Sequence, residues 1–149
     1  MLAKGVLVSA SSAATQRFSL IYVDDLVRGI MAAARSKKAV GRVYYITSSC
    51  SWSWDEVIAA ARPLLGFTKL YRISLPAPLM YFVGTVMGAI GSIQGKPALI
   101  NRDKVNELLQ NYWVCSPQQA QRDLGFTAET SLVEGVEKTI LWYQRQGWL

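Results

Sequence analysis

Residues 16–30, QRFSLIYVDDLVRGI, pass from a strand-like pattern to a helix-like pattern with no loop between them. The β-branched and aromatic run at 18–23 predicts a strand. Asp24 or Asp25 is then the expected N-cap of a helix. The expected buried apolar face of this helix consists of Leu26, Ile30, Ala33 and Ala34. A strand that leads directly into a helix is typical of α/β folds.

The same alternation continues along the chain. Gly41 precedes a second predicted strand at 42–47. Ser53 and Glu56 then have the spacing of a capping box, which predicts a helix start, and Gly66 is a natural stop. The buried stripe expected of this helix is Trp54, Val57, Ile58, Ala61 and Leu65.

Four further elements are predicted towards the C-terminus. A third strand is expected at 70–75, and helices at 102–112, from Pro117 to Gly125, and from Ser131 onward. With 149 residues, of which 51% are hydrophobic, the chain can bury a core. We expect one domain over residues 1–149, a helix-rich α/β fold with a few short strands.

Charge and composition exclude several classes of function. The net charge of +6 suits an anionic ligand, nucleic acid or an anionic membrane surface. Nucleic acid is disfavoured, because no Lys/Arg run is longer than 37–38 and aromatic residues do not alternate with basic ones. Histidine is absent and Cys50 lies far from Cys115, which excludes a zinc site and a histidine-assisted nucleophile. No secretory signal pattern is seen at 1–6, so a reducing cytoplasm is expected.

The segment 73–95 contains no charged residue. Its expected helical part, 78–94, is about 25 Å long, against about 30 Å for a bilayer core. We therefore expect a buried or pocket-lining helix first, a surface contact with a membrane second, and a membrane span last. The glycines within 84–91 imitate a dinucleotide-binding fingerprint, but they fall inside the apolar run and not between a strand and a helix.

Three segments carry a resemblance to a known family. They are QRFSLIYVDDLVRGI, GRVYYITSSCSWSWDEVIAAARPLLG and DLGFTAETSLVEGVEKTILWYQRQGWL, in this order. Together they resemble the C-terminal half of the NAD(P)-dependent epimerases/dehydratases, the extended short-chain dehydrogenases/reductases. The apolar segment 73–95 is similar to the branch with 3β-hydroxysteroid dehydrogenase-like and dihydroflavonol reductase-like enzymes.

The catalytic features of that family are missing from this sequence. The family uses a Tyr with a Lys four residues later, and none of the seven tyrosines here has that neighbour. The strand–glycine loop–helix unit that binds the dinucleotide is also missing. The resemblance therefore implies the second half of a longer enzyme, with NAD or NADP bound in the full-length protein. For residues 1–149 alone we expect no cofactor, no metal and no catalytic residue.

The resemblance also implies candidate substrate-binding residues. In sugar-nucleotide members of the family, an Arg at the place of Arg17 binds the substrate diphosphate; the alternative is an exposed arginine that closes a loop. Lys96 and Arg102 follow the apolar segment and could reach an anionic group of the substrate; the alternative is a solvated surface position for each. Tyr81 could line an apolar pocket, and the alternative is core packing. Asp24 and Asp25 are expected to cap and pack a helix, because adjacent side chains diverge and would not share a proton.

Three hypotheses for function remain open. The first is the substrate-binding portion of an NAD(P)-dependent sugar-nucleotide epimerase/dehydratase or related reductase, whose partners are a small-molecule substrate and the missing N-terminal half. The second is a stand-alone, non-catalytic binding module. The third is a membrane-associated fragment of a sterol- or flavonoid-type reductase. Peripheral membrane contact and self-association are left open by the sequence.

Overall fold

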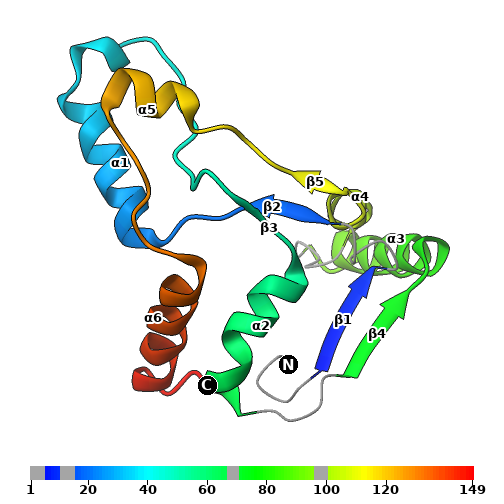
Figure 1. The fold of residues 1–149 in the computed structure, drawn as a ribbon. Helices are drawn as coiled ribbons and strands as arrows, with labels where there is room; N and C mark the ends of the chain where they lie inside the picture. Colours follow the sequence, from blue (N-terminus) through cyan, green and yellow to red (C-terminus); the bar gives the residue numbers. More distant parts are fainter. Residues whose placement is uncertain (1–5, 11–15, 67–70, 96–100) are drawn as a thin grey trace. The chain divides into compact units, whose positions relative to one another are not determined.

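A computed structural model describes residues 6–10, 16–66, 71–95 and 101–149. The chain divides into two compact units. Unit 1 comprises Met1–Gln16 and Phe67–Asn111, and unit 2 comprises Arg17–Gly66 and Tyr112–Leu149. Figure 1 follows the chain through the elements of both units.

Unit 1 holds a two-stranded sheet and a pair of helices. β1 (Val6–Ala10) runs parallel to β4 (Tyr71–Leu75). α3 (Ala77–Ile93) follows β4 and packs against α4 (Arg102–Leu108). β4 and α3 match the predicted strand and helix. β1 escapes prediction because its apolar run is only a few residues long.

The two helices of unit 1 approach closely at a glycine. A Cβ on Gly84 would lie 2.8 Å from Cγ2 of Val105 and 3.1 Å from the carbonyl oxygen of Asn101. Val105 is only 1% exposed and forms the centre of this contact. Glycine is therefore needed at position 84 to let α3 and α4 pack.

Unit 2 is built on a three-stranded sheet. β2 (Arg17–Ser19) lies in the middle, with β3 (Ser51–Trp52) antiparallel on one side and β5 (Tyr112–Trp113) parallel on the other. Four α-helices and one 3₁₀ helix complete it: α1 (Val23–Arg35), η2 (Lys37–Ala39), α2 (Trp54–Leu65), α5 (Gln118–Leu124) and α6 (Leu132–Arg145). α2 packs against α6, and α1 contacts α5. The helix-rich α/β class is thus confirmed.

Local helix signals in the sequence hold in the structure. The Ser53 hydroxyl accepts the N–H of Glu56, while the Glu56 carboxylate accepts the N–H of Ser53, so the capping box of α2 is complete. Gly66 ends α2 with φ of 68°, in the left-handed region. Ser131 likewise accepts the N–H of Glu134 at the start of α6. Trp54 departs from the expected buried stripe, since it is 42% exposed.

Strand predictions fared worse. The strand expected at 18–23 ends at Ser19, and the segment 42–47 is extended but is not part of a sheet. The helix expected at 102–112 ends at Leu108, because Tyr112 and Trp113 pair with β2 instead. An extended segment becomes a strand only where a neighbour supplies backbone partners, and no described strand lies beside 42–47.

α1 forms as predicted, but its buried face is rotated relative to the expected one. The helix begins at Val23 with Tyr22 as N-cap, so neither aspartate caps it. Its buried residues are Asp25 and Gly29. Of the predicted buried face, Ile30 and Ala34 are exposed, and Leu26 and Ala33 are half-buried. A Cβ on Gly29 would clash with the side chain of Ile46, which shows how closely this side is packed.

Most of the charge-free segment forms α3, and the length of this helix bears on whether it could span a membrane. Among the helices in the described part of the chain, none is both long and apolar enough to cross a bilayer. The membrane span, the last of the three alternatives for this segment, is therefore not found in the described residues.

Candidate functional site

Arg17 is the first residue of β2, and its side chain is engaged within unit 2. Its Nη1 lies 2.8 Å from Oε2 of Glu56, at the start of α2. The pairing of β2 with β3 brings this about, because β3 leads directly into α2. Phe18 and Trp54 reinforce the same junction with an edge-on ring contact, in which the ring centroids are 4.9 Å apart. Both charged side chains are nearly half exposed, so the pair faces solvent.

Glu56 holds this arginine with a carboxylate that is already fixed. Its Oε2 accepts the N–H and the hydroxyl of Ser53, each at 2.7 Å. These two hydrogen bonds, assisted by Arg17, hold the pKa of Glu56 below its ordinary value. Glu56 is therefore an ionised anchor for Arg17 and not a proton donor at neutral pH. The sequence analysis identified Glu56 as a capping residue but gave no signal for this second role.

The other predicted substrate-binding residues belong to unit 1. The Tyr81 hydroxyl donates to Oδ1 of Asn106 at 2.7 Å, across the α3–α4 contact. Arg102 opens α4 and is exposed. It shares a helix face with Asn106, four residues on, so Tyr81 and Arg102 lie on neighbouring parts of the same surface. Lys96 lies outside the described residues. The predicted residues thus divide between the two units.

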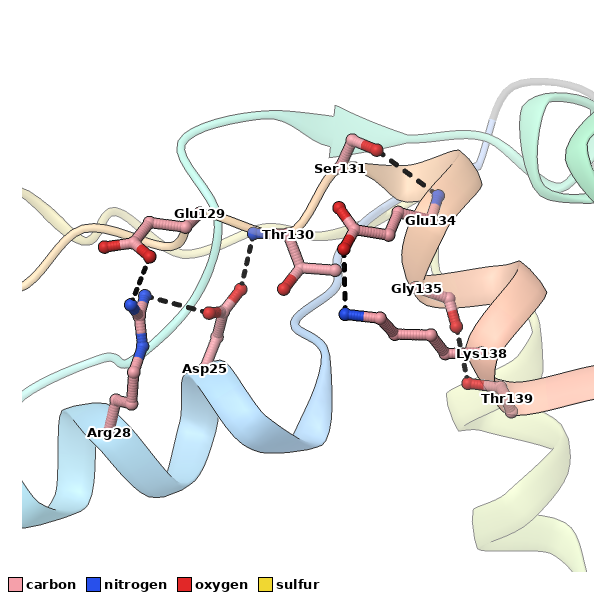
Figure 2. A network of polar contacts seen from close by, with 9 residues as sticks. All are labelled: Asp25, Arg28, Glu129, Thr130, Ser131, Glu134, Gly135, Lys138 and Thr139. Carbon is pink, nitrogen blue, oxygen red and sulfur yellow. Dashed lines mark hydrogen bonds and ion pairs between the residues drawn. The ribbon is translucent and has the colours of Figure 1, made fainter. Parts of the chain in front are cut away.

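A hydrogen-bond network joins α1 to the segment before α6 (Figure 2). Asp25, only 3% exposed, accepts the backbone N–H of Thr130 at 2.9 Å. It also pairs with Arg28 at 2.9 Å, and Arg28 contacts Glu129 on its other side. Burial raises the pKa of Asp25, but the hydrogen bonds from Thr130 together with Arg28 outweigh it and leave the pKa lowered. Asp25 is a packed, ionised structural residue, as expected, while Asp24 is exposed.

Unit 2 also contains an open cavity that the sequence analysis missed. Its volume is about 450 Å³, and Gln121 donates to the Ser49 hydroxyl across it at 3.0 Å. The residues that line it are Ser49, Val114, Cys115, Ser116, Pro117, Gln118 and Gln121. Apart from the Cys115 thiol none of these side chains titrates, so the cavity offers polar contacts but no acid or base.

Tyr44 has the most perturbed phenol among the described tyrosines. Its hydroxyl lies 3.1 Å from the Asp123 carboxylate. Desolvation, followed by the Asp123 contact, raises the pKa of Tyr44 above its ordinary value. A catalytic tyrosine in a reductase needs the opposite shift, so Tyr44 does not replace the missing Tyr-x-x-x-Lys tyrosine.

The described residues do not fit a dinucleotide or a metal ion. Gly84, Gly88 and Gly91 lie inside α3, where Gly84 faces α4, and they therefore cannot present N–H groups to a pyrophosphate. Within the described ranges, no three His, Cys, Asp or Glu residues gather closely enough to hold a metal. What the geometry offers is binding surface: a fixed arginine, an apolar helix and a polar cavity.

Comparison with known proteins gives this arrangement a context. No protein-family model matches the sequence. The ceramide reductase of Caulobacter vibrioides is 28% identical over 136 residues, which is 91% of this chain and 42% of the reductase. This chain therefore spans less than half the length of that relative.

Solved structures show the same partial coverage. An epimerase from Methanothermobacter thermautotrophicus matches 97% of this chain with a TM-score of 0.67 and 18% identity, using 34% of its own length. The UDP-glucuronic acid 4-epimerase from Bacillus cereus, solved with UDP-glucuronic acid and NAD, matches 98% with a TM-score of 0.65 and 18% identity, using 37% of its own length. This chain therefore has the fold of a C-terminal-like part of NAD-dependent epimerases and short-chain dehydrogenases/reductases.

Proposed function

We propose that this chain is the substrate-side part of an NAD(P)-dependent short-chain dehydrogenase/reductase, and that the dinucleotide-binding part lies in polypeptide outside residues 1–149. The observation that carries the proposal is the exposed apolar face of α1. A helix that exposes its apolar face has an unfilled packing position, and the proposed dinucleotide-binding part would fill it.

The exposed face of α1 is continuous. Val23, Val27, Ile30 and Met31 are each at least 44% exposed, and they follow the i, i+4, i+7, i+8 spacing of a single helix face. A helix on the surface of a protein normally buries such residues against the core. This spacing suits packing against the face of a sheet, as helices do in doubly wound α/β folds.

The extended segment 42–47 supports the same conclusion. Val43 and Tyr45 are 77% and 61% exposed, whereas Tyr44, Ile46 and Thr47 are half-buried or buried. This near-alternation is that of a strand with one face covered. No described strand pairs with the segment, and in this proposal a sheet edge of the dinucleotide-binding part would pair with it.

The division of chemistry follows from the residues present. The dinucleotide-binding part would supply the glycine-rich loop, the bound NAD(P) and the Tyr–Lys pair. Residues 1–149 would form the substrate side, with Tyr81, Lys96 and Arg102 as the proposed substrate contacts, and with Arg17 added only for a substrate that carries a diphosphate. In this proposal residues 1–149 are one substrate-binding domain, and the enzyme works in the cytoplasm.

A lipid-like carbonyl compound is the substrate class that we favour. The matched relative is named a ceramide reductase, and α3 brings a long surface without charge to the substrate side. Arg17 is already neutralised by Glu56, which weakens its case as a diphosphate ligand. The second candidate is a nucleotide-sugar epimerase, which the epimerase fold neighbours favour. It requires Arg17 to leave Glu56 when a diphosphate binds.

The test begins with the DNA upstream of the Met1 codon. An in-frame strand–glycine loop–helix and a Tyr-x-x-x-Lys are expected. The full-length protein should then oxidise NADH or NADPH with a long-chain ketone lipid, and Arg17→Ala should leave this activity within about twofold. Turnover of a UDP-sugar that is lost in Arg17→Ala would favour the epimerase. An upstream stop codon, or failure of the full chain to bind NAD(P)H, would refute the proposal in favour of a stand-alone module.

A further inference from the structure

α3 presents a second apolar surface, in unit 1. Its large hydrophobic side chains between 39% and 86% exposed are Leu79, Phe82, Val83, Val86, Met87, Ile90 and Ile93. Their spacing places them on one side of the helix over almost its whole length. We call this set the α3 stripe. A continuous exposed stripe of this kind marks a surface that contacts something other than water.

The opposite side of α3 is already occupied. Gly84 and Gly88 face Asn101 and Val105 of the α4 region, and Tyr81 bonds to Asn106. Apart from Val105 and the half-buried Leu109, the residues from 101 to 110 are exposed and mostly polar or charged. The α3–α4 pair therefore has an apolar outer side and a polar far side.

The charge pattern indicates what the stripe would meet. No charged residue occurs from 73 to 95, while Lys69 and Arg72 precede this run in the sequence and Lys96 follows it. Farther on, Lys104 is already paired with Glu107 within α4, and the whole chain carries a net charge of +6. A charge-free apolar helix with basic residues on both sides in the sequence suits the interface of an anionic membrane, where the acyl region meets acidic headgroups.

The geometry of the helix fits contact with a surface and not a span. With 17 residues, α3 is about 25 Å long, shorter than a bilayer core of about 30 Å. All hydrogen-bonding needs of its central backbone are met within the helix, so lipid can cover it without stranding a polar group. We propose that α3 lies flat on anionic lipid bilayers, with the α3 stripe immersed in the interface.

This inference goes beyond the proposed function and does not depend on it, because the contact is a property of α3 whatever the substrate is. A lipid substrate would give it a purpose: the stripe would hold the substrate side of the enzyme at the membrane that contains the lipid.

The test compares vesicle binding by two matched double variants. Phe82→Gln with Val86→Gln alters the stripe, while Thr85→Gln with Ser92→Gln alters exposed positions that point more than 100° away from the centre of the stripe. Neither pair changes the charge. The probe is co-sedimentation with vesicles of phosphatidylcholine and phosphatidylglycerol, with vesicle-free samples to correct for aggregation and circular dichroism to check folding.

The unaltered protein should sediment with the anionic vesicles. The stripe variant should bind at least about tenfold more weakly and the control within about twofold. Equal binding by both variants, or no binding by the unaltered protein, would overturn the proposal. A dimeric unaltered protein and a monomeric stripe variant in size-exclusion chromatography, with no vesicle binding by either, would also overturn it. The stripe would then be an interface between two copies.

Discussion

Replacing Asp25 tests whether the network in Figure 2 holds unit 2 together. The carboxylate is 3% exposed and accepts a backbone N–H from Thr130, while it also pairs with Arg28. In Asp25→Ala, the N–H of Thr130 loses its acceptor inside the protein. We therefore expect a large loss of stability from one exchange far from any proposed substrate contact.

The magnitude follows from these two contacts. A hydrogen bond to a charged group contributes about 1.5–3 kcal/mol. The Arg28 pair adds only about 0.5–1 kcal/mol, because the side chain of Arg28 is 43% exposed. Asp25→Ala should thus lower the free energy of unfolding by about 2–4 kcal/mol. Asp25→Asn keeps an acceptor for Thr130 and should cost about 1–2 kcal/mol.

The effect has a defined pH dependence. The pKa of Asp25 is lower in the folded protein than its ordinary value, so the charged carboxylate contributes stability above the unfolded pKa. This contribution is lost as the pH falls through the folded pKa. The difference between the unaltered protein and Asp25→Asn should therefore be constant from about pH 5 to 8 and shrink below about pH 4.

Urea unfolding followed by tryptophan fluorescence is the appropriate assay, because all five tryptophans belong to unit 2. Asp24→Asn is the matched control: the same exchange one residue away, at an exposed position of the first helical turn, should cost about 0.3–1 kcal/mol. If the two variants are equally stable, or if Asp25→Asn costs as much at pH 3 as at pH 7, the structural role assigned to Asp25 is wrong.

Three further exchanges test local contacts. Gly84→Ala should lower the stability of unit 1 by about 1–3 kcal/mol through overpacking. Gly88→Ala should raise it by about 0.5–1 kcal/mol, because the nearest atom to the added Cβ, the Cβ of Asn101, lies 3.7 Å away. Thermal melting followed by circular dichroism measures both changes. Glu56→Ala should lower the melting temperature more than Arg17→Ala, since it removes a helix cap as well as the ion pair; equal losses would contradict the anchor role. Tyr81→Phe should cost about 0.5–1.5 kcal/mol by removing the hydroxyl contact with α4, and an unchanged melting curve would show that this contact is not formed.

Features that depend on nearby residues could be predicted from the sequence. The capping box of α2 and its stop at Gly66 involve partners at most four residues apart. A short pattern therefore contains all the information needed. The same is true of the helix start at Ser131.

Features that depend on distant residues could not. β5 replaces the end of a predicted helix because Trp113 pairs with Phe18, which lies 95 positions earlier. Thr130, whose backbone N–H donates to Asp25, is 105 positions away. The cavity brings Ser49 to Gln121, and no periodicity connects those two positions. The family resemblance makes Arg17 a candidate, but its Glu56 partner depends on strand pairing.

The two exposed apolar surfaces, although similar in composition, require different partners. The backbone of α3 is satisfied within its own helix, so an apolar medium that offers no hydrogen bonds can cover the α3 stripe. The apolar face of α1 belongs to the same unit as the segment 42–47, which carries backbone groups with no strand partner in the described part of the chain. Lipid would leave those groups without hydrogen bonds, at a cost of several kcal/mol each, whereas a β-strand would satisfy them. Backbone hydrogen bonding is therefore compatible with the membrane proposed for the α3 stripe, and it favours a protein partner with a sheet beside the surface of α1.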